Sequence, residues 1–298
     1  MMDTPSAPPE LSDLQKIIGA HTPDTGENPT AIAGLSLYRR IAQTPCYRAI
    51  YDPSLTLFAQ GRKAVNVGGV DYLGMAGRFL ISSVDLPVQS QVIEASADKP
   101  LLSMLLSIDS ALLREVIAGQ EQPAGMPMPD AGAVALGEAS AGLIEACTRL
   151  VRLLDQPQDI AFMAPLIQRE ILYRLLQTPQ SARLRAIASA SDHSHRTARA
   201  IGWLRRHYAR PMRIEDLADV AHMGVSTLHH HFRALTAMSP LQYQKQLRLQ
   251  AAREKMIGGM DATAAAYAVG YESVSQFNRE YARLFGQPPL RDVKALRA

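Results

Sequence analysis

The last third of the chain contains the same local pattern twice. In each copy a short helix-forming stretch, a break that contains glycine and a second helix-forming stretch follow one another, first from Ile214 and again from Ala262. In the second stretch of each copy, apolar residues recur at i, i+4 and i+7, which predicts one buried face per helix. These residues are Leu228, Phe232 and Leu235 in the first copy and Phe277, Tyr281 and Leu284 in the second. This order of elements predicts two helix-turn-helix motifs in tandem.

A single helix is predicted between the two motifs. Pro240 precedes residues 241–256, and Gly258 and Gly259 follow them. Proline suits the first position of a helix, and glycine suits the position after its end. At 1.5 Å per residue this linking helix is about 24 Å long. Two recognition helices on such a spacer could enter major-groove faces about 34 Å apart.

Charge is divided unevenly along the chain. Residues 1–190 carry 15 Lys and Arg against 19 Asp and Glu, a net charge of −4, whereas residues 191–298 carry 16 against 9, a net charge of +7. A basic domain beside an acidic one is typical of a protein that binds a polyanion with one domain only. On charge alone, a solvated basic surface without a partner is the alternative. The two motifs favour double-stranded DNA as the polyanion.

Length and composition exclude several classes of protein. The chain has 298 residues, of which 47% are hydrophobic and 20% charged, as in a globular protein of about two domains. The longest dense apolar stretch, residues 101–108, is shorter than the ~18 residues that cross a membrane, and no apolar signal segment follows the first Met. We therefore expect a cytoplasmic protein without a membrane partner. Cys46 and Cys147 are too few for a disulfide framework and are expected to be buried thiols.

The first two thirds of the chain have a different periodicity. Over residues 35–109, short apolar runs alternate with turn-forming residues about every ten positions, which predicts an all-β sandwich or barrel. Helical spacing follows, and two helices are expected over residues 133–154 and 159–177. The prolines and glycines of residues 1–34 favour a loosely ordered N-terminal arm.

Specific residues in both regions resemble one known family. Segments of the last hundred residues resemble the AraC/XylS transcription regulators, namely residues 210–218, 238–243, 247–249, 251–253, 269–277 and 284–286. Three earlier segments resemble the cupin-type N-terminal domain of one AraC subfamily, namely residues 51–55, 60–63 and 83–87. The resemblance covers roughly residues 35–298.

The resemblance implies a fold class and a function. The fold class is α+β: a cupin-like β-barrel sensor domain with C-terminal dimerisation helices over residues 35–186, and then an all-α domain over residues 196–298 with two helix-turn-helix motifs joined by a linker helix. A protein of this kind is a sequence-specific DNA-binding transcription regulator and not an enzyme. Its expected partners are double-stranded DNA, a second copy of itself, a small-molecule effector and, if it activates transcription, RNA polymerase.

The first motif departs from the family pattern at two positions. Gly224 stands where the family often has serine, and Ala237 stands where a C-cap glycine is usual. We expect the first motif to be less stable for this reason, by up to ~1 kcal/mol. Ser226 is predicted to cap the recognition helix, with Thr227 as its first residue.

With the apolar stripes buried, both recognition helices present polar residues to solvent. The predicted DNA-binding residues are Ser226, Thr227, His229, His230 and Arg233 in the first motif and Val274, Ser275, Gln276, Asn278, Arg279 and Arg283 in the second. The resemblance implies that base edges are faced by Ser226, His229, His230, Val274, Ser275, Gln276 and Arg279. Arginine can bind guanine with two hydrogen bonds, and glutamine can pair with adenine.

Other roles are possible for the arginines of the basic domain. Arg279 could instead form a surface ion pair with Glu280 or Glu272. Phosphate contacts are expected from Arg205, Arg206 and Arg210, with a solvated basic face as the alternative.

The sequence predicts no metal site, cofactor or catalytic residue. His229, His230 and His231 are consecutive, and consecutive helical side chains point about 100° apart, so they cannot converge on one ion. The predicted barrel contains no histidine, because the only one before residue 193 is His21. A cupin-type ligand carrier or enzyme with a helical tail that binds nucleic acid non-specifically remains the alternative function. A chromatin-bending protein is a third class.

Four residues of the predicted barrel could line an effector pocket, namely Tyr51, Phe58, Tyr72 and Arg78. Because no metal ligands are available, the effector should be held by apolar burial and a few hydrogen bonds. The alternative is that these aromatic residues fill the core of a barrel that binds nothing.

Overall fold

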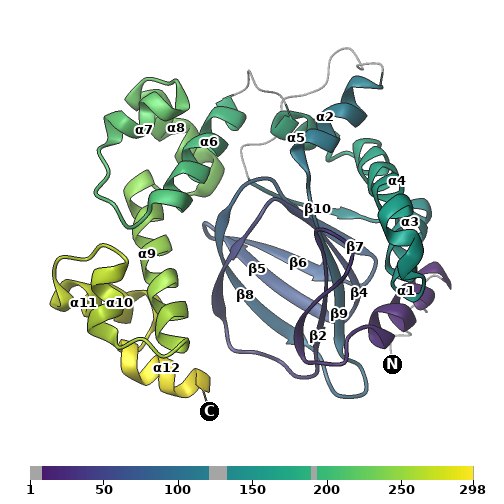
Figure 1. Ribbon diagram of the computed structural model, residues 1–298, viewed down its shortest axis with the longest axis horizontal. Coiled ribbons are helices and arrows are strands. Elements are labelled where there is room, and N and C mark those ends of the chain that lie inside the picture. The colour runs from purple at the N-terminus through teal and green to yellow at the C-terminus, as the bar shows by residue number, and fades with distance from the viewer. Residues whose placement is uncertain (1–8, 121–132, 189–192, 298) are drawn as a thin grey trace. The chain divides into compact units, whose positions relative to one another are not determined.

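The computed structural model describes residues 9–120, 133–188 and 193–297 (Figure 1). The chain divides into two compact units, an N-terminal one that extends to His195 and a C-terminal one that starts at Arg196. The first unit is rich in β-strands, and the second is helical.

Two antiparallel sheets form the centre of the N-terminal unit. The larger sheet has the strand order β1-β2-β9-β4-β7-β10 and the smaller one β3-β8-β5-β6. The strands are β1 (Gly26–Pro29), β2 (Leu35–Arg40), β3 (Tyr47–Tyr51), β4 (Ser54–Gln60), β5 (Arg62–Val67), β6 (Val70–Met75), β7 (Arg78–Ser82), β8 (Leu86–Glu94), β9 (Leu101–Ser107) and β10 (Val134–Glu138). Turns separate most of these strands, and Gly68 and Gly69 make the two-residue turn between β5 and β6 with φ of 59° and 91°. The predicted β-rich architecture is confirmed.

Helices cover one face of the larger sheet (Figure 1). They are α1 (Pro9–Ala20), α2 (Ser110–Ala118), α3 (Ala141–Arg152), the short η1 (Leu153–Asp155), α4 (Pro157–Leu176) and α5 (Ser181–Ala188). Leu55 and Leu57 of β4 join the same buried cluster as Leu150 of α3 and Ile171 of α4. Because side chains alternate along a strand, the intervening residues of β4 face the opposite side of this sheet.

Three local features differ from the sequence prediction. Residues 9–29 are not a loose arm, because α1 buries Leu11 and Leu14 in the core and β1 pairs with β2. The helix expected over residues 133–154 starts only at Ala141, since residues 134–138 form β10 along β7. Cys147 is buried as expected, but Cys46 is exposed. Burial, with a smaller contribution from the charge of Glu170, raises the pKa of Cys147 to about 12.

The C-terminal unit contains the two predicted motifs on one linking helix. Its helices are α6 (His193–His207), α7 (Ile214–Ala221), α8 (Val225–Thr236), α9 (Pro240–Ile257), α10 (Ala262–Ala268), α11 (Val274–Phe285) and α12 (Pro289–Arg297). Helices α7 and α8 form the first motif, and α10 and α11 form the second. Helix α9 joins them, and Ser239 and Gln242 form a capping box at its start.

The boundaries of the first motif lack the residues that usually stabilise them. Its turn places His222 in the left-handed region at φ 51°, whereas Gly224, the predicted turn glycine, is extended and caps α8 without a side-chain hydrogen bond. Helix α8 therefore starts at Val225, two residues before the predicted start. At its end Ala237 is also left-handed, at φ 59°.

The second motif has the expected residues at the same places. Gly270 and Gly286 take the left-handed positions at φ of 89° and 80°. The Ser273 side chain accepts a hydrogen bond from the Gln276 backbone N–H and caps α11. The same fold is thus built twice with different local stability.

We predict that Ala237→Gly stabilises the C-terminal unit by about 1 kcal/mol, because a left-handed backbone costs an alanine roughly that much more than a glycine. The reciprocal change Gly286→Ala should destabilise it by a similar amount, since open space surrounds Gly286 and only its φ opposes a Cβ atom. Denaturant unfolding followed by the fluorescence of Trp203, the single tryptophan of the chain, reports on this unit. If both substitutions changed the free energy of unfolding in the same direction, the prediction would be wrong.

Candidate nucleic-acid interface

Helices α8 and α11 each bury one face and expose the other. Leu228 and Phe232 of α8 and Phe277 and Tyr281 of α11 are fully buried, as the repeated spacing predicted. The third position of each stripe is only half-buried. The predicted DNA-binding residues lie on the opposite, exposed faces, namely Ser226, Thr227, His229, His230, Arg233, Ser275, Gln276, Asn278, Arg279 and Arg283, with Val274 half-buried beside them.

Arg279 is not engaged by the carboxylates that could have paired with it. Glu280 pairs instead with Lys245 of α9, at 2.8 Å. Arg279 takes part in none of the ion pairs of the described residues. Its guanidinium is exposed on the same side of α11 as Ser275 and Gln276. It is therefore available to a ligand outside the chain.

Gln276 differs from its exposed neighbours because both its backbone and its side chain are held. Its backbone N–H donates to Ser273 Oγ at 3.3 Å, and its Nε2 donates to Glu280 Oε1 at 3.1 Å. The spacing of i and i+4 places Gln276 and Glu280 on one side of the helix.

Arg248 of the linking helix α9 ties the segment after α6 to the turn of the second motif. Its guanidinium donates to the carbonyl oxygens of Tyr208 and Arg210 after α6 and to that of Gly270 in the turn of the second motif, at 2.7, 3.0 and 2.8 Å. Gln244 also donates to the first two carbonyls. Sequence reasoning did not assign this role, because every residue has a backbone carbonyl and the residue type does not show which carbonyls accept a hydrogen bond from Arg248.

Close backbone packing accompanies these hydrogen bonds. A Cβ atom on Gly270 would lie 2.0 Å from the carbonyl oxygen of Ala209, so the second turn can approach this segment only with glycine at this position. A further anchor holds the last helix, where Arg253 pairs with the buried Asp292 at 2.7 Å and Tyr281 donates to the same carboxylate at 2.7 Å.

The predicted phosphate-contacting arginines lie at the end of α6 and just after it. Arg205, Arg206 and Arg210 all have exposed side chains. The Arg210 carbonyl accepts from Arg248 and Gln244, which fixes the backbone that carries this side chain. Earlier in the helix, Arg196 donates to the carbonyl of His222 at 3.3 Å.

Three of the four predicted pocket residues, Tyr51, Phe58 and Tyr72, border one face of the smaller sheet, because Tyr72 lies opposite Val65 and Gly74 lies opposite Lys63 across β5 and β6. Phe58 fills the core, since a Cβ atom on Gly74 would lie 2.3 Å from its ring. Tyr51 lies beside Ser90, with their hydroxyl oxygens 3.3 Å apart, and Tyr72 is half-buried on β6.

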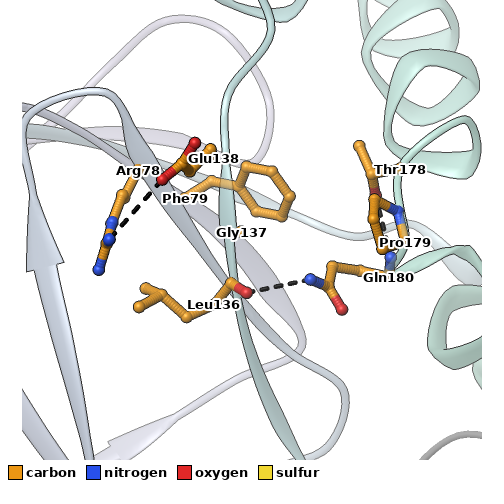
Figure 2. Close-up of a pocket in the computed structure, with 8 residues that line it drawn as sticks. All are labelled: Arg78, Phe79, Leu136, Gly137, Glu138, Thr178, Pro179 and Gln180. Carbon is orange, nitrogen blue, oxygen red and sulfur yellow. Dashed lines mark hydrogen bonds and ion pairs between the residues drawn. The ribbon is translucent and has the colours of Figure 1, made fainter.

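Arg78 lines a separate cavity at the edge strand β10 (Figure 2). Its guanidinium lies 3.7 Å from Glu138 across the two strands, and Gln180 donates to the Leu136 carbonyl on the other side of the cavity. The cavity measures about 460 Å³, and Phe79 forms part of its wall.

A cluster that sequence reasoning missed lies on the smaller sheet. Lys63 shares a face of β5 with the buried Val65 and Val67. Its Nζ lies 5.9 Å from the ring centroid of Tyr47 and 5.5 Å from that of Tyr51, both on β3. The alternation within residues 62–67 is a signal that could have placed Lys63 on the buried face, but not beside these tyrosines.

Comparisons with known proteins agree with this architecture. A family model described as the AraC-type transcriptional regulator N-terminus matches residues 31–183, and a helix-turn-helix domain model matches residues 217–294. The transcriptional activator RhaS of Yersinia pestis is 28% identical over 151 residues, 50% of this chain and 52% of RhaS. A putative AraC-like transcription regulator of Streptomyces lividans is 37% identical over 93 residues, 31% of each chain. The chain thus matches about half the length of RhaS and about a third of the length of the Streptomyces lividans regulator.

Solved structures of ToxT from Vibrio cholerae have the same fold over most of the chain. The unsaturated fatty acid complex aligns with a TM-score of 0.58 at 12% identity, covering 87% of this chain and 94% of ToxT. A complex with (E)-4-(8-methylnaphthalen-1-yl)but-3-enoic acid aligns with a TM-score of 0.56, also at 12% identity, covering 87% and 97%.

The two family models and the two motifs identify the class of protein. No helix among the described residues is long and apolar enough to span a membrane. The N-terminal model alone matches half of the chain, and the second model covers both helix-turn-helix motifs. The chain therefore belongs to the AraC family of transcriptional regulators, and it is a DNA-binding regulator rather than an enzyme.

Proposed function

We propose that this regulator reads a specific DNA sequence by placing α8 and α11 in successive major grooves. The observation that carries the proposal is the pair of exposed polar helix faces on one linking helix, where Phe232 of α8 packs on Tyr243 of α9 and Glu280 of α11 pairs with Lys245 of α9. A fixed spacing between the two helices lets one protomer recognise two adjacent segments of an operator. A carrier with a non-specific helical tail would not need this spacing.

Within this interface the arginines have two roles. Arg279, exposed and outside the ion pairs of the described residues, is assigned to a base edge, where guanine O6 and N7 accept both of its donors. Arg205, Arg206 and Arg210 are assigned to phosphates, because they lie outside the recognition helices. Base contacts set the sequence preference, whereas phosphate contacts strengthen binding to every sequence.

Arg279→Ala and Arg206→Ala should therefore differ in kind. Arg279→Ala should weaken the operator complex by ~1–3 kcal/mol and remove the preference for one base at one position of the operator. Arg206→Ala should weaken binding to all sequences alike and reduce the slope of log affinity against log salt concentration by about one. The operator comes from selection of genome fragments by the purified protein, followed by binding-site profiles of both variants at several salt concentrations.

Two results would count against this function. A wild-type protein with equal affinity and salt dependence for all sequences would favour a non-specific nucleic-acid-binding tail. A profile of Arg279→Ala that matches the wild type at every position would exclude Arg279 as a base-reading residue.

We further propose that the N-terminal unit controls DNA binding by taking up a carboxylic acid at Lys63. Burial alone lowers the pKa of Lys63, but Tyr51 and Tyr47 outweigh that effect, and the pKa lies above its usual value. The ammonium thus keeps its charge beside the rings of Tyr47 and Tyr51, and no ion pair of the described residues includes it. A partly buried cation favours an anionic partner.

The ligands of the ToxT structures support this chemistry. ToxT, which shares the fold, has been solved with an unsaturated fatty acid and with a butenoic acid derivative, both of them carboxylic acids. A ligand of this class would place its carboxylate at Lys63 and its apolar part among the buried valines of β5. It could shift DNA affinity only by binding more tightly to one arrangement of the protein than to another.

Lys63→Met should abolish the response to carboxylic acids. In the wild type, saturating acid should raise thermal stability, by about 2.7 kcal/mol at a hundred times its Kd, and should change operator affinity. Lys99→Met is the matched control, because Lys99 is an exposed loop lysine. A series of straight-chain acids, with and without a chelator, provides the ligands. A response that survives in Lys63→Met, or that chelation removes, would contradict the proposal.

The partner proposed for α4 is a second copy of the chain. Phe162, Leu166 and Tyr173 on this helix are 75%, 50% and 49% exposed. With Arg169 they follow the alternating spacing of four and three residues that forms the seam of paired helices. A homodimer would bury these apolar side chains and would bring four recognition helices to one operator. If the regulator activates transcription, RNA polymerase is a further partner.

Leu166→Glu should convert the dimer to a monomer, because two carboxylates would meet in the apolar seam. Val70→Glu is the control, since Val70 is similarly exposed, at 56%, but lies in the β5–β6 hairpin. Sedimentation equilibrium measures the mass of each variant. A wild-type monomer at micromolar concentration, or a Leu166→Glu dimer, would show that α4 is not the interface.

A further inference from the structure

The carboxylate of Glu280 is the centre of a hydrogen-bond network beneath the exposed face of α11. Its side chain is 12% exposed. Oε1 accepts from Lys245 Nζ at 2.8 Å and from Gln276 Nε2 at 3.1 Å, and Oε2 accepts from the Tyr271 hydroxyl at 2.8 Å. The three donors come from α9, from the first turn of α11 and from the turn that precedes it.

Glu280 is ionised at neutral pH. Burial raises the pKa of this carboxyl, but the hydrogen bonds from Lys245, Gln276 and Tyr271 outweigh it, and the pKa lies below its usual value. An ionised carboxylate can only accept hydrogen bonds. It therefore fixes which end of the Gln276 amide faces it, since the reversed amide would set two acceptor oxygens against each other.

We propose that Glu280 is a positioning residue that sets the base preference of Gln276. The inference rests on the proposed function, in which Gln276 faces DNA. With one amide N–H committed to Glu280, Gln276 offers one remaining N–H and its carbonyl oxygen. Adenine matches this pair, because its N7 accepts and its N6 amino group donates. Guanine offers two acceptors, O6 and N7, and matches it poorly.

The other members of the network keep Glu280 in place. Lys245 links it to α9, and the ring of Tyr271 packs on Phe277 with centroids 5.4 Å apart. The Ser273 cap fixes the backbone of Gln276 at the same time. The orientation of the amide is thus set before DNA arrives.

The test compares binding-site profiles of full-length variants on the selected operator. Glu280→Gln preserves size but removes the charge that orients the amide. It should reduce the preference at the base position read by Gln276 about tenfold and leave the other positions and the salt slope unchanged. Gln276→Ala should lose the preference at the same position, and the double variant should lose no more than Gln276→Ala alone.

Two further variants separate positioning from simple destabilisation. Tyr271→Phe removes a hydrogen bond from the other carboxylate oxygen, so it should preserve the base preference even where it lowers stability. Glu280→Asp keeps the charge but withdraws it from Gln276, so it should relax the same position. It serves as the second test if Glu280→Gln does not fold, as judged by Trp203 fluorescence.

Each other outcome overturns the proposal. If Glu280→Gln retains the wild-type profile while Gln276→Ala does not, Gln276 reads its base unaided. If Glu280→Gln weakens all sequences equally, Glu280 is a structural residue. If Gln276→Ala leaves the profile unchanged, Gln276 reads no base, although the protein remains sequence-specific. If the wild-type protein bound all DNA sequences equally, the proposed function itself would be refuted.

Discussion

Both recognition helices are held by the linking helix α9, because Phe232 of α8 packs on its Tyr243 with ring centroids 5.4 Å apart and Glu280 of α11 pairs with its Lys245 at 2.8 Å. Arg248 of α9 holds the segment after α6 and the turn of the second motif through three carbonyl oxygens, at distances of 2.7 to 3.0 Å. An arginine suits this position because it presents several donors in a rigid plane. Without these contacts of α9 the two motifs would vary in orientation, and DNA binding would have to restrict that motion at an entropic cost.

The two motifs share a fold but differ in how firmly their ends are held. The second has a serine cap and left-handed glycines, and Tyr281 ties its recognition helix to Asp292. The first has His222 and Ala237 in the left-handed region and Gly224 as its cap. Strain in the first motif lies at the end of α7, at His222, and at the end of α8, at Ala237, so the last turn of α8 can fray at lower cost than that of α11.

The N-terminal unit has a helix-covered apolar core and a smaller sheet that carries polar side chains among buried ones. Helices α1, α3 and α4 complete the apolar core on one face of the larger sheet. The smaller sheet carries Lys63, Tyr47 and Tyr51 together.

The sequence by itself determined the features that depend on local periodicity. The repeated i, i+4, i+7 stripes identified both recognition helices and therefore their exposed faces, and the runs of about ten residues identified the β-rich unit. Local pattern failed where a segment obtains its structure from distant partners. Residues 134–138 are a strand because β7 pairs with them, and α1 is ordered because the core accepts Leu11 and Leu14. Only the tertiary structure brought Lys63 to Tyr47 and joined Gln276, Glu280 and Lys245, because side-chain neighbours from separate elements depend on strand order and helix packing, which the spacing within one element does not encode.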